Sequence, residues 1–181
     1  YLQLKRNELL PELPTDLVEY LEEITNLNRK RNLAILEQVK EITSILHKHH
    51  ISPVFLKGVA HLLFGLYTDI AERMIGDIDF LVAEDKVVEA ADLLIKKGYL
   101  PVVEYKPEMF AKLKHFPTLQ NFNYPAAVEI HKEVLNPENQ KLFRGFEVLR
   151  DKKPVTEIQN QAFIPSLPNL IIHNVFNAQL S

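Results

Sequence analysis

Apolar residues in the first fifty positions follow the period of an amphipathic helix. They recur mostly three or four positions apart from Leu17 to Leu27 and again from Ile35 to Leu46, a spacing that places side chains along one helix face. Thr15-Asp16 precedes the first stripe and is the predicted N-cap. The basic triplet 29–31 separates the two stripes. The pattern therefore predicts one long helix, or two helices that join near Asn28.

Beyond residue 50 the pattern changes to short apolar runs separated by longer amphipathic segments. Gly58 ends the first apolar run, Gly98 ends an amphipathic segment, and Pro125 divides two later runs. Predicted strands cover residues 52–56, 77–82, 99–104, 119–123, 127–134 and 157–165. Predicted helices cover residues 59–67, 84–97 and 107–115, and a last helix follows Ser166. A polar loop over residues 69–76 leads into the second strand.

Two acidic residues stand inside one of these apolar runs. Asp77 and Asp79 are two positions apart, so in a strand both carboxylates leave the same face while Ile78 and Phe80 leave the other. Without a counter-ion the pair would repel by about 3 kcal/mol at ~5 Å and an effective dielectric constant of ~20. Mg²⁺, which prefers oxygen ligands and often keeps water and substrate phosphates in its remaining positions, would make the arrangement favourable.

Two further segments carry polar side chains where chemistry could use them. Lys57-Gly58 lies between a predicted strand and a predicted helix, a geometry that binds anions through free backbone amides. Glu129 and His131 share one face of the later strand, where a third acid would serve a second metal ion or act as a general base. The alternatives are an ordinary strand-to-helix turn and a half-exposed edge strand.

Composition narrows the class of protein. The 181 residues, 46% of them hydrophobic and 25% charged, suit one globular domain, or one and part of another. The absence of cysteine excludes disulfides and zinc–thiolate sites. A net charge of −3 makes nucleic acid an unfavoured partner without excluding it. No apolar run approaches a membrane span and no signal peptide is visible, so we expect a cytoplasmic protein without a membrane partner.

The two ends of the chain suggest that more sequence belongs to this protein. The sequence starts at Tyr1 rather than methionine and stops at Ser181 inside the last predicted helix, where no stop signal closes the helix. We therefore expect a piece of a longer protein. Glycine-rich P-loop and Gly-x-Ser-x-Gly patterns are both missing, which leaves a serine-hydrolase interpretation without support.

Taken in order, the polar and glycine positions resemble a known superfamily. The chain reads Leu56-Lys57-Gly58, Arg73, Asp77-Ile78-Asp79-Phe80-Leu81-Val82, Gly98-Tyr99 and Val128-Glu129-Ile130-His131. This order resembles the nucleotidyltransferase superfamily with its polymerase-beta-like fold. It looks closest to the bacterial group usually labelled "uncharacterised nucleotidyltransferase". It is more distantly similar to nucleotidyltransferase toxins of abortive-infection systems. The resemblance covers roughly residues 50–135 and, loosely, Leu170–His173; the N-terminal helices lie outside its diagnostic core.

The resemblance implies an α/β (α+β) fold in which a small mixed sheet is flanked by helices. On this basis we expect an N-terminal helical segment over residues 1–50 and a nucleotidyltransferase core over residues 51–165. Residues 166–181 would begin a C-terminal helical region.

The resemblance also implies a reaction and a set of site residues. Asp77, Asp79 and Glu129 would be catalytic and would bind Mg²⁺, with two ions serving an in-line attack on the α-phosphorus of an NTP such as ATP. The nucleotide-binding set would be Lys57, Gly58, Arg73 and His131. Two departures stand out: Val59 follows Gly58 where a second glycine or a serine is usual, and the third acid is glutamate rather than the commoner aspartate.

Three alternatives remain open from the sequence. The domain could be a nucleotide-binding or regulatory module that has lost transfer, a toxin that modifies tRNA or protein, or a plain structural domain whose aspartates cap turns. The acceptor does not follow from the sequence, because its site would be built largely from the missing C-terminal part. The choice of NTP does not follow either, because base recognition in such folds often rests on a few backbone contacts. The sequence does not indicate the oligomeric state.

Overall fold

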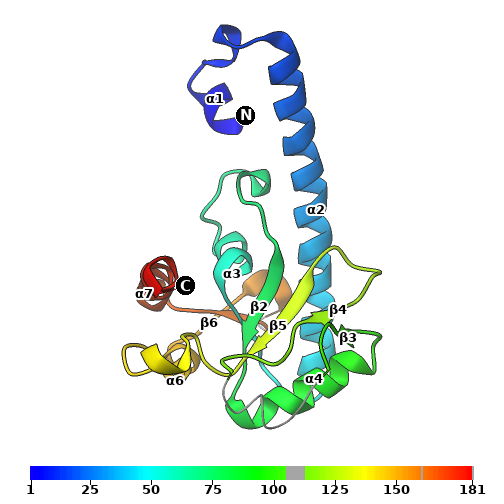
Figure 1. Cartoon of the computed structure of the whole chain (residues 1–181), viewed down its shortest axis with the longest axis vertical. Helices are drawn as coiled ribbons and strands as arrows, with labels where there is room; N and C mark the ends of the chain where they lie inside the picture. Colours follow the sequence, from blue (N-terminus) through cyan, green and yellow to red (C-terminus); the bar gives the residue numbers. More distant parts are fainter. Residues whose placement is uncertain (105–112, 160, 181) are drawn as a thin grey trace.

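A seven-stranded mixed sheet forms the centre of the protein (Figure 1). The structure is a computed structural model that describes residues 1–104, 113–159 and 161–180. The strand order is β3-β4-β5-β2-β1-β7-β6. The strands are β1 (Val54–Phe55), β2 (Asp77–Leu81), β3 (Leu100–Pro101), β4 (Leu119–Gln120), β5 (Ala127–His131), β6 (Lys153–Pro154) and β7 (Phe163–Ile164). The expected α/β class with a mixed sheet between helices is confirmed.

Helices surround the sheet. The α-helices are α1 (Leu2–Arg6), α2 (Thr15–His47), α3 (Lys57–Leu63), α4 (Val87–Ile95), α6 (Gly145–Arg150) and α7 (Leu167–Leu180). Short 3₁₀ helices are η1 (Leu10–Glu12), η2 (Ile70–Glu72), η3 (Glu84–Lys86), η4 (Pro137–Asn139) and η5 (Thr156–Ile158). Among the described residues no helix is both long and apolar enough to cross a membrane.

The two longest strands, β2 and β5, lie side by side and run parallel at the centre of the sheet. Ile78 pairs with Val128 and Asp79 pairs with Glu129. On the other side of β2, β1 runs antiparallel, with Phe55 opposite Phe80. This topology places the acid pair of β2 and the acid of β5 in adjacent strands at the same level.

The two faces of the sheet pack against different partners. Ile78, Phe80, Val128 and Ile130 belong to the larger core, which includes apolar residues of α2 and α4. Because side chains alternate along a strand, Asp79 and Glu129 leave the opposite face. Leu81, two positions beyond Asp79, packs there in a smaller core with residues of α6. The alternation expected for residues 77–80 is therefore confirmed.

Helix α2 is one continuous helix of 33 residues, which resolves the choice between one helix and two. Its first half extends beyond the sheet and its second half runs along the sheet (Figure 1). The buried residues begin at Asn28 and continue through Asn32 and Ile35 to Leu46. The expected side-chain N-cap is wrong: Pro14 stands at the cap position, and no side chain caps the helix.

Several elements are shorter than the sequence pattern predicts. The strands expected over 52–56, 99–104 and 157–165 are two-residue strands β1, β3 and β7. The helix expected over 59–67 is α3, which begins two residues earlier, at Lys57. Gly98 ends the α4 segment as expected, with a left-handed φ of 90°. Most of the helix expected over 107–115 lies outside the described residues.

Candidate active site

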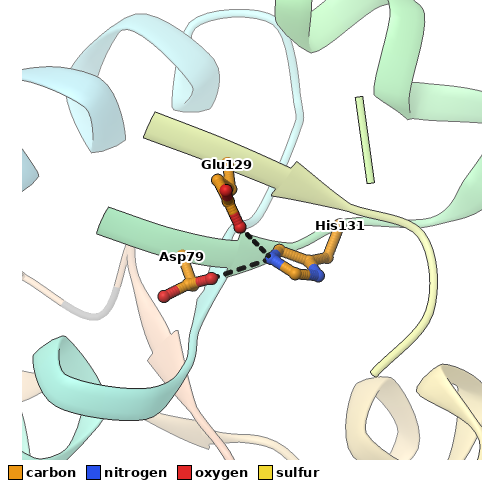
Figure 2. A group of neighbouring side chains, drawn as sticks. All are labelled: Asp79, Glu129 and His131. Carbon is orange, nitrogen blue, oxygen red and sulfur yellow. Dashed lines mark hydrogen bonds and ion pairs between the residues drawn. The ribbon is translucent and has the colours of Figure 1, made fainter. Parts of the chain in front are cut away.

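Strand register brings the candidate acids together. Asp79 of β2 and Glu129 of β5 are direct partners in the parallel ladder, and His131 is the partner of Leu81. Figure 2 shows the three side chains Asp79, Glu129 and His131 converging from these two strands. Asp79 and His131 are each 1% exposed, whereas the Glu129 side chain is 18% exposed. Asp79 and His131 therefore form the buried part of the cluster, and Glu129 forms its accessible edge.

His131 lies between the two carboxylates. Its Nε2 is 2.9 Å from Asp79 Oδ1 and 3.5 Å from Glu129 Oε2, while its Nδ1 is 3.3 Å from the Glu133 carbonyl oxygen (Figure 2). Burial lowers the pKa of His131, but hydrogen bonds to Asp79 and Glu129 outweigh burial, so this pKa lies above its ordinary value. The carbonyl contact fixes the ring orientation with Nε2 toward the acids.

Lys57 enters the cluster from the start of α3. The Leu56 amide donates to the Asp79 carbonyl oxygen at 2.9 Å, which sets the next residue beside the acid pair. The Lys57 ammonium group then hydrogen-bonds Asp79 Oδ1 and lies 4.0 Å from Glu129 Oε2. Lys57 adopts a left-handed φ of 47°, a conformation that costs about 1 kcal/mol or more for a residue with a side chain. Such strain is typical of functional sites.

The acids of β2 differ in their environments. Burial raises the pKa of Asp79, but hydrogen bonding and the charges of His131 and Lys57 hold it well below its usual range. Asp77 is half-buried, and its pKa is raised by burial and then by the Asp79 charge. Asp79 is thus firmly ionised, whereas Asp77 lacks comparable stabilisation of its charge. A bound cation would remove this disadvantage of Asp77.

Gly58 has a packing role that its sequence context does not suggest. Its backbone is not left-handed; Lys57, one residue earlier, takes that conformation. A Cβ at Gly58 would lie 3.3 Å from Ile75 Cγ1 and 3.7 Å from Arg73 Nε. Gly58 therefore permits close approach of the loop that carries Arg73.

The loop before β2 is held by side chains of α2. Asn28 and Asn32 both donate to the Arg73 carbonyl oxygen, at 3.1 and 2.7 Å. Arg31 donates to the carbonyl oxygens of Ile75 and Pro125. The Arg73 side chain itself is exposed. Part of the basic triplet that interrupts the apolar stripe therefore fixes the segment that leads into Asp77.

The structure adds site residues that the sequence patterns did not single out. Thr118 donates to Glu129 at 3.2 Å, and His115 Nε2 is 3.9 Å from the same carboxylate. Burial lowers the pKa of Lys114, and the nearby Lys57 charge lowers it further. His173 of α7 is 1% exposed. A signal for His173 existed in its spacing of four from Asn169, which places two polar residues on the buried face of α7.

His173 gives a pH-dependent prediction. Burial, followed by the charges of His131 and Lys57, lowers its pKa to about 4, below the ordinary value near 6.5. The folded protein therefore binds a proton there less readily than the unfolded chain, and stability is lost as pH falls from about 6.5 toward 4. We expect wild type to lose up to about 3 kcal/mol relative to His173→Gln over this range. Urea unfolding at pH 7.5 and pH 4.5 would measure it; a constant difference between the two proteins would contradict it.

The donor set fits a divalent cation. One ligand atom each from Asp79, Glu129 and His131 lies within 4.8 Å of the others. Two carboxylates suit Mg²⁺ or Mn²⁺, and an imidazole nitrogen is also accepted by Mn²⁺ and other transition metals. Asp77 leaves the same strand face two residues before Asp79 and is close enough for the charges of Asp79 and Glu129 to raise its pKa.

Comparison with known proteins places this fold and this cluster in the nucleotidyltransferase class. The chain belongs to the family described as uncharacterised nucleotidyltransferases, whose model matches residues 1–178. The resemblance read from residues 50–135 is confirmed, and the match extends across the N-terminal helices.

A solved structure supports the fold. A crystal structure from Thermotoga maritima, described as a "putative nucleotidyltransferase", matches with a TM-score of 0.57 at 14% sequence identity. The match covers 81% of this chain and 86% of that chain. At this identity the likeness concerns the fold. No curated protein matches the sequence.

Proposed function

We propose that this protein is a metal-dependent nucleotidyltransferase that moves an NMP group from an NTP to an acceptor hydroxyl. The observation that carries the proposal is the register of β2 and β5, which sets Asp79 opposite Glu129. Carboxylates so close in adjacent strands, on the sheet face away from the main core, need positive charge between them. Membership of the family supplies the reaction class.

Asp77, Asp79 and Glu129 would hold the metal, with Mg²⁺ as the proposed ion and two ions as the proposed number. When bound, such ions neutralise the triphosphate charge and lower the pKa of the attacking hydroxyl. Glu129 is the most accessible member of the described cluster. It is therefore the residue proposed to accept the acceptor proton, which requires hydrogen-bond reach of that hydroxyl.

The remaining predicted residues would bind or orient the nucleotide. Lys57 lies at the acid cluster, and Arg73 lies on the loop that approaches Gly58; both cations are proposed to contact phosphates. Positioning of this kind supplies much of phosphoryl-transfer catalysis. His131 is buried behind the acids, so its proposed influence on the nucleotide runs through Asp79 and Glu129, which it orients.

One observation favours a second candidate, a nucleotide-binding module without transfer. Asp79 is already paired with two basic side chains, Lys57 and His131. If that pairing were permanent, the cluster would be structural and metal would not enter. The two candidates differ in whether pyrophosphate is released.

The test uses the protein with a cell extract as acceptor source. Labelled ATP, GTP, CTP and UTP, each with Mg²⁺, should transfer label from the α-phosphate to an acceptor and release pyrophosphate for at least one nucleotide. Glu129→Gln should lower the rate by about 10²-fold or more, because a proton acceptor and metal ligand is lost. Nucleotide binding by calorimetry without pyrophosphate release would favour the second candidate.

A further inference from the structure

Lys57 lies where a cation would be expected among the acids, and this has a consequence for how the site takes up its metal. We propose that the Lys57 ammonium group is a built-in counter-cation that a divalent ion must displace; this inference rests on the proposed function. The displaced ammonium group would then bind the phosphates of the incoming NTP. Metal and nucleotide would accordingly enter together, and the free ion alone would bind weakly.

The backbone directs Lys57 into the cluster. The Leu56 amide donates a backbone hydrogen bond of 2.9 Å to the Asp79 carbonyl oxygen, and α3 begins immediately afterwards. The left-handed φ of Lys57 makes the turn between them. A residue with a side chain takes this conformation only where its surroundings enforce it. The backbone thereby places the side chain beside the acids of β2 and β5.

The contacts of Lys57 are those that a metal ion would replace. Its ammonium group hydrogen-bonds Asp79 and lies 4.0 Å from Glu129. These two carboxylates are also members of the group that could hold a metal ion. An ammonium group and a divalent ion would compete for the space between them, because both bind the oxygens of these two carboxylates.

The lysine can leave the cluster without unfolding it. Its side chain is 25% exposed, whereas that of Asp79 is 1% exposed. A lysine has a flexible four-carbon stem and an ammonium group that binds phosphate as a point charge. An NTP that arrives with its metal supplies both the ion that replaces Lys57 and the phosphate that receives it. Binding of the two ligands is then positively coupled, and the coupling is reciprocal.

The charges around the cluster agree with this exchange. Three carboxyl groups, those of Asp77, Asp79 and Glu129, gather at the cluster, and the Lys57 ammonium group already lies against two of them. A free divalent ion therefore meets carboxylates whose charge is already partly neutralised by Lys57. Removing the Lys57 charge should increase the attraction for the free ion.

The experiment measures Mn²⁺ binding to nucleotide-free protein at fixed pH by electron paramagnetic resonance. Lys57→Met should bind Mn²⁺ about tenfold or more tightly than wild type, equivalent to ~1.4 kcal/mol. Lys57→Arg keeps the charge and should resemble wild type. Lys114→Met removes a nearby positive charge that makes no contact with Asp79 in the described structure, and should tighten binding by less than about threefold. Circular dichroism checks folding, and Lys57→Gln replaces Lys57→Met if the latter does not fold.

The outcomes separate this inference from the proposed function. Equal or weaker Mn²⁺ binding by Lys57→Met, or equal tightening by Lys114→Met, would overturn the displacement of Lys57. A second measurement uses α,β-methylene ATP, which should tighten Mn²⁺ binding more in wild type than in Lys57→Met. If no nucleotide binds or reacts, the proposed function fails, while the comparison of free-ion affinities still decides the role of Lys57.

Discussion

Asp79→Asn is expected to reduce nucleotidyl transfer by at least ~10³-fold while leaving a folded protein. The side chain is buried and accepts hydrogen bonds from Lys57 and His131. Asparagine keeps the shape but removes the charge that would hold a cation and that balances both basic groups. Stability should also fall, by about 3 kcal/mol, because a buried ion pair loses one partner. Label transfer, Mn²⁺ binding and urea unfolding would measure the three effects.

Asp85→Asn is the matched control for this prediction. This substitution makes the same chemical change at Asp85, an exposed carboxylate in η3 a few residues after β2. Activity and Mn²⁺ binding should remain close to wild type. Full activity of Asp79→Asn would show that Asp79 is not catalytic. Loss of activity with unchanged Mn²⁺ binding would show that Asp79 is not a metal ligand, although it could still be catalytic.

Gly145→Ala is expected to destabilise the protein by about 1–3 kcal/mol. Gly145 begins α6 and packs against the segment that follows β5. A Cβ there would lie 2.9 Å from the Lys132 carbonyl oxygen, 3.2 Å from Glu133 Oε2 and 3.3 Å from Leu81 Cδ1. A backbone oxygen cannot move aside cheaply, and Lys132 directly follows His131. We therefore expect lower activity as well as lower stability, measured by urea unfolding and by label transfer.

Gly76→Ala is the matched control for the Gly145 substitution. A Cβ at Gly76 would meet nothing within 4 Å, and its φ is not left-handed. Its free energy of unfolding should change by no more than about 0.5 kcal/mol. Similar losses for both variants would mean that the loss of glycine itself, rather than crowding at the end of β5, is responsible.

The sequence predicted the central part of the site because that part depends on local periodicity. The two-residue spacing of Asp77 and Asp79, and of Glu129 and His131, fixes their faces in any strand. Pairing of β2 with β5 does not follow from either strand alone, since it is decided by packing of both apolar faces. The superfamily resemblance supplied only the expectation that Glu129 joins Asp77 and Asp79 as the third acid; the pairing itself, with Asp79 opposite Glu129, comes from the structure.

Other features depend on contacts between distant segments, which a sequence pattern does not contain. The contact of Lys57 with Asp79 requires the left-handed turn at Lys57, where local preference would favour glycine. An isolated β-bridge between His115 and His131 of β5 brings His115 near Glu129, and the sequence around His115 has no strand pattern. The short strands β1, β3 and β7 are overpredicted because apolar runs continue beyond the residues that form ladder hydrogen bonds.

Helix α2 limits how far this protein can be truncated from its N-terminus. Through Asn28, Asn32 and Arg31 it holds the carbonyl groups of the segment that leads into Asp77. Its second half also supplies Ile35, Val39, Ile42 and Leu46 to the core beneath β2 and β5. The sheet is consequently not a self-sufficient folding unit, and the smallest fragment that retains the geometry of the acids has to begin upstream of Asn28.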